Sequence, residues 1–113
     1  MAKTLIFGAT GGIGCSLAKR LNGAGKKIHL AGRDEAALSE LAGKLSCGYS
    51  SCDIHDANSL AQAVSDASED GVLDGLVWAI GSILLKPMAR LGAADFANTY
   101  YVNVTAAALA IQA

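Results

Sequence analysis

Short apolar runs alternate along the chain with stretches in which apolar residues recur at helical spacing. The clear runs lie at 4–7, 26–31 and 72–80, and a weaker one lies at 48–52. After the second run, the apolar residues recur every three or four positions at Leu38, Leu41, Ala42 and Leu45. Short apolar runs are typical of buried strands, and a period of about 3.6 residues is typical of a helix that buries one face. The pattern predicts strands at the runs and helices between them.

Glycine and aspartate residues mark the ends of these helices. Asp34 and Asp56 stand at the start of the second and third helical stretches, where an aspartate side chain can accept a free backbone N–H. Gly23 and Gly25 end the first helix, and Asp95 opens a final helical stretch. The apolar stripe of the first helix is Ile13, Leu17 and Leu21. That of the third is Leu60, Ala63, Val64 and Ala67.

Strict alternation of strands and helices predicts an α/β fold with a parallel sheet covered on both faces. We expect a partial doubly wound sheet of strand order 3-2-1-4 with flanking helices. The last helical stretch is still running at Ala113, with no glycine or proline after it. We therefore expect residues 1–113 to be one domain, and a truncated one.

A glycine-rich segment, Gly8-Ala9-Thr10-Gly11-Gly12-Ile13-Gly14, joins the first strand to the first helix. Such a turn lets the backbone approach a pyrophosphate, while the free N–H groups of the helix attract the anion. The residues we expect to bind the phosphates of a dinucleotide are Gly8, Thr10, Gly12, Ile13 and Gly14. A glycine turn that serves packing alone is the alternative for this segment taken by itself.

The residue after the second strand indicates which dinucleotide is bound. An acidic residue there would bind the ribose 2′-hydroxyl, but this strand ends at Ala31-Gly32 and Arg33 follows. Arg33 lies about 20 residues beyond the loop, which is the usual spacing for the residue that reads the ribose. An arginine favours a 2′-phosphate, so we expect NADP(H) rather than NAD(H). The alternative is a solvated arginine with a weak ion pair to Asp34.

Composition and charge exclude several classes of partner. The 113 residues are 52% hydrophobic and carry a formal net charge of −1, with acidic and basic residues interspersed. Neither nucleic acid nor a membrane is favoured, and we expect a cytoplasmic protein. The three cysteines form no C-x-x-C pair, and His29 and His55 are separated, so we expect no disulfide framework and no metal site. Both histidines are interpreted as structural or solvent-facing.

Together these segments resemble the short-chain dehydrogenase/reductase family, whose fold is Rossmann-like. The glycine loop has the family's G-x-x-x-G-x-G spacing. The segment 52–56 is similar to the one in which the family's aspartate contacts adenine, which implies that role for Asp53 and a backbone approach for Ile54. The segment 77–81 stands where the family has Asn-Asn-Ala-Gly, and it supplies Ala79 and Gly81 as cofactor-binding candidates. Only the glycine of that motif is retained.

The segment 101–105 resembles the middle of the family's next helix, where an asparagine belongs to an Asn-Ser-Tyr-Lys catalytic tetrad. The resemblance makes Asn103 the candidate catalytic residue. By periodicity alone Asn103 shares a helical face with Phe96, Tyr100 and Ala107, so its amide would need partners if it were buried. A satisfied core asparagine is the alternative.

The resemblance implies a reaction as well as a fold. The parent reaction would be hydride transfer between NADP(H) and a small-molecule carbonyl or secondary alcohol. The loop 82–91 follows the carboxyl end of the fourth strand, so Ile83, Leu84 and Met88 are candidate apolar substrate contacts. Simple packing beneath the final helix is the alternative for these three residues. The family's Tyr-x-x-x-Lys pair is absent, because no lysine follows Lys86. This 113-residue chain is therefore expected to be inactive, and a homo-oligomer is expected.

Three alternatives stay open: a dinucleotide-binding pseudoenzyme or regulatory module without turnover, a structural half-domain, and a fragment of the family's extended branch. That branch includes sugar-nucleotide epimerases and dehydratases. Gly11 permits its G-x-x-G-x-x-G spacing.

Overall fold

The computed structural model describes residues 3–69, 71–81 and 84–113, and strands and helices alternate along them as predicted. The strands are β1 (Thr4–Phe7), β2 (Ile28–Gly32), β3 (Gly48–Ser51) and β4 (Gly75–Trp78). The α-helices are α1 (Gly12–Gly23), α2 (Glu35–Leu45), α3 (Ala57–Ala67), α4 (Ala93–Tyr100) and α5 (Ala106–Gln112). A 3₁₀ turn, η1 (Met88–Arg90), precedes α4, and a π-helical segment, η2 (Tyr101–Thr105), joins α4 to α5.

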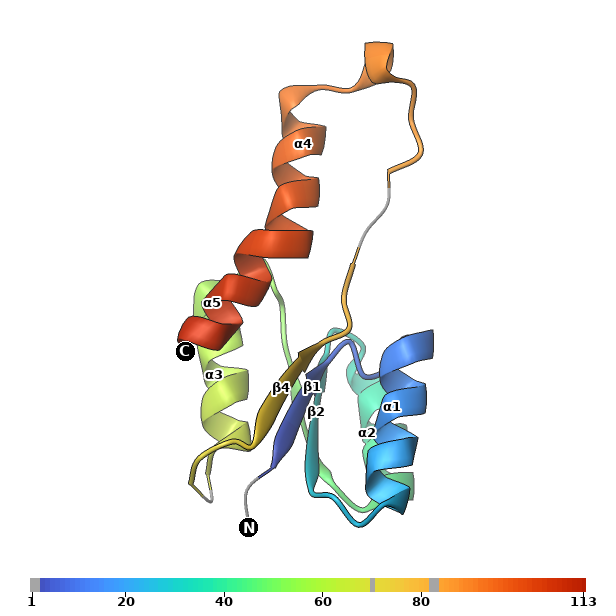
Figure 1. The fold of residues 1–113 in the computed structure, drawn as a ribbon, viewed down its shortest axis with the longest axis vertical. Helices are drawn as coiled ribbons and strands as arrows, with labels where there is room; N and C mark the ends of the chain where they lie inside the picture. Colours follow the sequence, from blue (N-terminus) through green and yellow to red (C-terminus); the bar gives the residue numbers. More distant parts are fainter. Residues whose placement is uncertain (1–2, 70, 82–83) are drawn as a thin grey trace.

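The four strands form one parallel sheet in the order β3-β2-β1-β4, which confirms the predicted topology. β1 lies in the middle, with Phe7 opposite Ala31 of β2 on one side and Trp78 of β4 on the other. Helices α1 and α2 cover one face, and α3 and α5 cover the other (Figure 1). Helix α4 continues the line of α5 past the end of the sheet, giving the molecule a longest extent of 50 Å (Figure 1).

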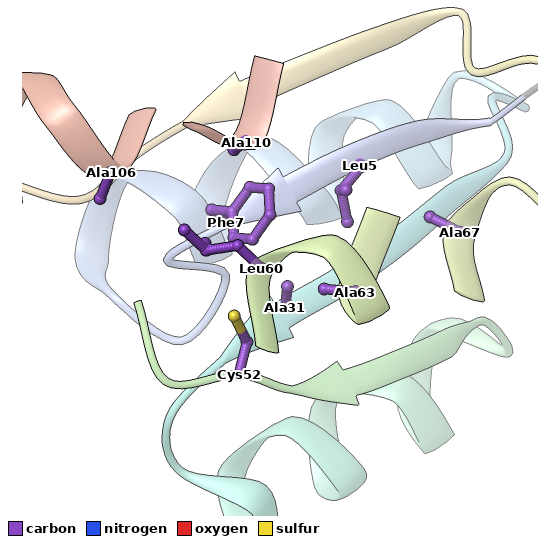
Figure 2. Packing of buried hydrophobic residues seen from close by; sticks show 9 residues of the cluster. All are labelled: Leu5, Phe7, Ala31, Cys52, Leu60, Ala63, Ala67, Ala106 and Ala110. Atoms are coloured by element: carbon purple, nitrogen blue, oxygen red, sulfur yellow. The ribbon is translucent and has the colours of Figure 1, made fainter. Parts of the chain in front are cut away.

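Alternate side chains of the central strands point into two separate cores. Leu5 and Phe7 lie in the core beneath α3 and α5, whereas Ile6 and Leu30 lie in the core beneath α1 and α2. Figure 2 shows the first core, in which Phe7 lies near Leu60 of α3 and Ala106 and Ala110 of α5. The covering helices contribute four small side chains to this core, Ala63, Ala67, Ala106 and Ala110. Their size lets both helices pack closely on the sheet.

The two predicted aspartate caps are confirmed. The Asp34 carboxylate accepts the N–H of Ala37 at 3.1 Å at the start of α2. The Asp56 carboxylate accepts the N–H of Asn58 at 2.9 Å at the start of α3. Each cap satisfies one backbone donor that the helix leaves unpaired, and such a cap contributes about 1 kcal/mol.

Two expectations for the helices are wrong in detail. Ile13 is 79% exposed and does not belong to the apolar stripe of α1, because the inward face is made by Gly14 and Ala18. A residue next to an inward-facing position is turned by about 100° around the helix axis, and this places Ile13 outside. The final helix begins at Ala93 rather than at Asp95, whose carboxylate instead accepts the N–H of Gly92 at 3.0 Å from within the first turn.

The fourth strand is shorter than predicted and only partly covered. β4 ends at Trp78, and each of its residues is half-buried. Val72, which the sequence places in this strand, lies before it and is exposed. Among the described residues, none of the helices is long and apolar enough to cross a membrane.

Candidate functional site

A cavity of about 350 Å³ lies at the carboxyl ends of all four strands. The segments that line it follow β1, β2, β3 and β4 in turn, and η2 closes one side. In an open parallel sheet, ligands bind at this edge, where neighbouring strands lead to helices on opposite faces. The lining residues are Phe7, Gly8, Thr10, Gly32, Arg33, Cys52, Asp53, Ile54, His55, Ile80, Gly81 and Val102. The cavity therefore brings together Gly8, Thr10, Arg33, Asp53, Ile54 and Gly81 of the sequence-based candidates.

Two positions of the glycine loop have no room for a side chain. Gly8 has a φ of +79°, and a Cβ atom there would lie 2.6 Å from the carbonyl oxygen of Ala79. A Cβ atom at Gly14 would lie 2.0 Å from the carbonyl oxygen of Gly8. The loop thus packs between the end of β4 and the first turn of α1. Gly14 and Ala79 serve this packing and do not line the cavity, so their predicted cofactor contacts stay predictions.

The first turn of α1 is open to a ligand. Gly12 is exposed, and a Cβ atom there would have nothing within 4 Å. Within the described residues, no side chain caps this end of the helix, and its first turn contains no acidic residue. Its free N–H groups and the positive end of the helix dipole therefore favour an anion. Gly12 and exposed Ile13 stand at this turn but outside the lining of the cavity.

Arg33 supplies the positive charge at the β2 side of the cavity. It is exposed, as is Thr10 across from it on the glycine loop, and both line the cavity. Asp34 is engaged in capping α2, and within the described ranges Arg33 forms no ion pair with it. The geometry thus leaves the guanidinium accessible to an anion in the cavity.

The segment after β3 forms a closed turn at the cavity. The Asp53 carboxylate accepts the N–H of His55 at 3.0 Å, and the Asp53 carbonyl accepts the N–H of Asp56 at 3.1 Å. The Asp53 N–H donates to the Ser59 hydroxyl at 2.9 Å. Cys52, just before it, is buried, and burial raises the pKa of its thiol, with a hydrogen bond from Ser59 opposing the shift. The Cys52 thiol is therefore kept neutral beside the exposed Asp53.

Asn103 lies outside this cavity and is exposed, so the alternative of a buried core asparagine is wrong. Its amide nitrogen donates to the carbonyl of Thr99 at 2.9 Å. A Cβ atom at Gly81 would lie 3.2 Å from the amide oxygen, so Asn103 stands directly beside the cavity residue Gly81. Asn103 itself lines a second cavity, of about 560 Å³, with Leu84, Phe96 and Tyr100.

The helix changes its hydrogen-bond pattern around Asn103. The N–H of Ala106 donates to the carbonyl of Tyr101, five residues back, as in a π-helix. The Thr99 carbonyl, which in a regular helix accepts the backbone N–H of residue 103, accepts a hydrogen bond from the Asn103 side chain. Segments of π-helix inside α-helices are frequent at functional sites.

Sequence reasoning missed half of the cavity lining. His55 was interpreted only as structural or solvent-facing, yet it lines the cavity next to Asp53. Ile80 and Val102 also line it, and Val102 could have been found from its place beside the Asn103 candidate. Of the proposed substrate contacts, Ile83 lies outside the described residues, Leu84 lines the second cavity, and Met88 is exposed.

Comparison with known proteins agrees with this geometry. An uncharacterised oxidoreductase of Mycobacterium tuberculosis is 34% identical over 115 residues, which cover 96% of this chain and 42% of that protein. A Brucella melitensis short-chain dehydrogenase/reductase, described as a glucose/ribitol dehydrogenase, has a TM-score of 0.91 at 26% identity. That match covers 98% of this chain and 49% of the other. An actinorhodin polyketide ketoreductase with NADPH shares the fold, with a TM-score of 0.90 at 24% identity over 98% of this chain and 45% of that one.

The chain spans less than half the length of the curated relatives it matches. The match to a family is nevertheless nearly complete along this chain: the short chain dehydrogenase model covers residues 2–113. On that match the chain belongs to the short-chain dehydrogenase family, a family of oxidoreductases that use nicotinamide dinucleotides.

Proposed function

We propose that residues 1–113 form the NADP(H)-binding portion of a short-chain oxidoreductase. The observation that carries the proposal is the single cavity edge shared by the glycine loop, Arg33 and Asp53. Two features of the glycine loop fit a dinucleotide. In the part of the chain that the structure describes, no side chain caps the first turn of α1, and Gly8, where the backbone leaves no room for a Cβ atom, lines the cavity with its backbone alone. When bound, NADP(H) would supply or accept a hydride.

Different residues of the cavity and of the first turn of α1 bind different parts of the dinucleotide. The free N–H groups at Gly12 and Ile13 and the hydroxyl of Thr10 bind the pyrophosphate. Arg33 binds the 2′-phosphate of the adenosine ribose with charge-assisted hydrogen bonds. The adenine lies against Asp53 and Ile54, with Gly81 on the β4 side facing the rest of the cofactor. The polyketide ketoreductase that shares this fold also has NADPH.

For the whole protein we propose reversible hydride transfer to a small carbonyl compound or from a secondary alcohol. Asn103 would belong to its catalytic group, on the π-helical turn beside Gly81. The oxidoreductase relative from Mycobacterium supports the class of reaction. This chain holds no Tyr-x-x-x-Lys pair, so taken alone it binds the cofactor without turning it over.

We also propose a cytoplasmic location and self-association. The support for self-association is an apolar strip on α4 and η2, formed by Phe96, Tyr100 and Val104, which are all exposed. These residues recur every four positions and so lie along one side of the helix.

The charge reversal Arg33→Asp tests the choice of cofactor. The affinities of the chain for NADP⁺ and NAD⁺ are measured by isothermal titration calorimetry, before and after the substitution. We expect NADP⁺ to bind roughly 10- to 100-fold more tightly than NAD⁺, from charge-assisted hydrogen bonds of about 1.5–3 kcal/mol. Arg33→Asp should reverse the preference.

Arg90→Asp is the matched control, because Arg90 in η1 is also an exposed arginine and does not line the cavity. It should leave both affinities unchanged. Equal affinities in the unmodified chain, or a preference that survives Arg33→Asp, would overturn the assignment of Arg33.

A further inference from the structure

The turn after β3 is tied to the π-helical segment by a tyrosine far away in the sequence. The Tyr101 hydroxyl donates a hydrogen bond to the backbone carbonyl of Ile54. Tyr101 is half-buried and packs against the core beneath α3 and α5, so its ring is held in place from behind. The carbonyl that it holds belongs to the cavity residue between Asp53 and His55.

His55 makes a second tie to the same helix. Its ring stacks on that of Tyr101, with the ring centroids 5.2 Å apart and the planes 15° from parallel. Its Nε2 lies 3.3 Å from the amide oxygen of Asn98, one turn earlier in α4. On the other side, the Asp53 carboxylate accepts the His55 N–H and lies 3.5 Å from Nδ1. The ring is thus bounded by Tyr101, Asn98 and Asp53.

These contacts fix the part of the cavity that the phosphate-binding residues leave for the base. With the glycine loop at the pyrophosphate, Arg33 at the ribose 2′-position and Gly81 toward the rest of the cofactor, the base is left the part of the lining that includes 53–55 and Val102. Val102 is the neighbour of Tyr101 and is buried. The hydrogen bond and the stacked rings therefore join the two segments, 53–55 and η2, that line the space assigned to adenine.

We propose that Tyr101 and His55 are positioning residues for adenosine binding, and we call this pair the latch. The latch holds the Asp53–Ile54 backbone in its binding geometry before the cofactor arrives. Ordering a loop in advance removes an entropic cost that binding would otherwise carry. The proposal rests on the proposed dinucleotide function, but it concerns affinity for the adenosine half and not the choice between NADP(H) and NAD(H).

Tyr101→Phe removes the hydroxyl and keeps the stacked ring. Loss of one hydrogen bond should weaken binding of NADP⁺ and NAD⁺ by the same factor, roughly threefold to tenfold. The ratio of the two affinities should stay that of the unmodified chain, because Arg33 is untouched. Adenosine 2′,5′-bisphosphate, which carries only the adenosine half, should lose affinity by the same factor.

Two comparisons separate positioning from general structure. Tyr100→Phe likewise removes a tyrosine hydroxyl, but from the preceding residue, whose exposed side chain does not line the 350 Å³ cavity. This variant should leave the affinity for each dinucleotide unchanged. His55→Ala removes the stacking and should weaken binding severalfold, whereas His55→Phe retains a ring and should recover most of the affinity. His55 has an exposed side chain, so these variants keep the test available even if Tyr101→Phe does not fold.

The outcomes are distinct. If the unmodified chain binds neither dinucleotide, the proposed function fails and the latch with it. If the chain binds and both Tyr101→Phe and His55→Ala bind as tightly as it does, the latch alone is overturned. A changed NADP⁺ to NAD⁺ ratio in Tyr101→Phe would also overturn it, because the effect would then lie at the ribose and not at the adenosine wall.

Discussion

Adding one methyl group at Gly14 should destabilise the fold, whereas the same change at Gly12 should not. A Cβ atom at Gly14 would lie 2.0 Å from the Gly8 carbonyl oxygen, 2.8 Å from its carbon and 3.1 Å from Cα of Ala9. All three are backbone atoms and cannot rotate away. Gly8 cannot retreat, since its N–H is bonded to Ala31 at 3.0 Å and it packs against Ala79 behind. Helix α1 must therefore move away from the loop.

The magnitude follows from the size of that movement. Ordinary van der Waals contact begins near 3.4 Å, so relief requires a shift of more than 1 Å between α1 and the loop. Overpacking of this kind costs typically about 1–3 kcal/mol, and contacts with rigid backbone belong at the upper end. For a domain of this size, a loss of about 3 kcal/mol lowers the melting temperature by roughly 10–20 °C.

Gly12→Ala is the matched control within the same helix. The added Cβ atom has nothing within 4 Å, and alanine is favoured over glycine in a helix by about 0.5–1 kcal/mol. Its melting temperature should be unchanged or higher. If the first turn approaches the pyrophosphate as proposed, Gly12→Ala should weaken dinucleotide binding in a stable protein.

Thermal unfolding can be followed through Trp78, the single tryptophan, whose ring packs 5.0 Å from that of Phe7 in the core. Equal melting temperatures for Gly14→Ala and the unmodified chain would refute the argument from close approach. A Gly12→Ala variant that binds the dinucleotide normally would refute the placement of the pyrophosphate at this turn.

Three further predictions concern pH and activity. Burial, and then the charge of Lys3, lower the pKa of His29, so the unfolded chain binds a proton at this residue more readily than the folded chain. The free energy of unfolding should therefore fall as pH drops below about 6.5. Denaturant titrations at pH 5–8 should show a weaker fall for His29→Gln. Hydrogen bonds from Gln62 and Ser50 lower the pKa of Asp66, so its contribution should be lost as pH falls below 3.8, and Gln62→Ala should reduce that loss at low pH. The purified chain should show no carbonyl-dependent loss of NADPH absorbance; a measurable rate would contradict the assignment of its catalytic residues.

Sequence patterns that span a few residues correctly predicted the strands of the sheet and the aspartate caps of α2 and α3. Apolar runs and the glycine loop placed β1 without error, and Asp34 and Asp56 cap the helices they precede. These features depend on neighbours a few residues apart, which the sequence contains directly. Ile13 was misplaced because its neighbour Gly14 packs against the loop, and a glycine leaves no trace in an apolar pattern.

Features that depend on contacts between residues far apart in the chain could not be predicted from the sequence. The π-helical turn at Asn103 has no glycine or proline to mark it, and the side-chain hydrogen bond from Asn103 to the Thr99 carbonyl accompanies it. The latch joins positions 47 residues apart through the Tyr101 hydroxyl and the Ile54 carbonyl. A backbone carbonyl looks the same at every residue, so only the folded chain reveals this partner.

Self-association is the last prediction, and two surfaces could support it. β4 is an edge strand among the described strands, and an unpaired edge can pair with another chain. Helix α4 extends past the sheet with Phe96 53% and Tyr100 63% exposed. Large apolar side chains in one strip are typical of an interface, because burying them against a second copy removes them from water. We expect the strip on α4, rather than the β4 edge, to form the main interface, because it exposes large apolar side chains that association can bury.

Light scattering over a concentration series distinguishes these surfaces. The unmodified chain should scatter with a mass above 11.4 kDa that grows with concentration, and Phe96→Lys should return it to 11.4 kDa. Val72→Lys is the control, because Val72 is 85% exposed just before β4 and away from α4. Association that survives Phe96→Lys would move the interface from α4 to the β4 edge. A mass of 11.4 kDa at every concentration would refute self-association, because mass action raises the associated fraction of any self-associating protein as its concentration increases.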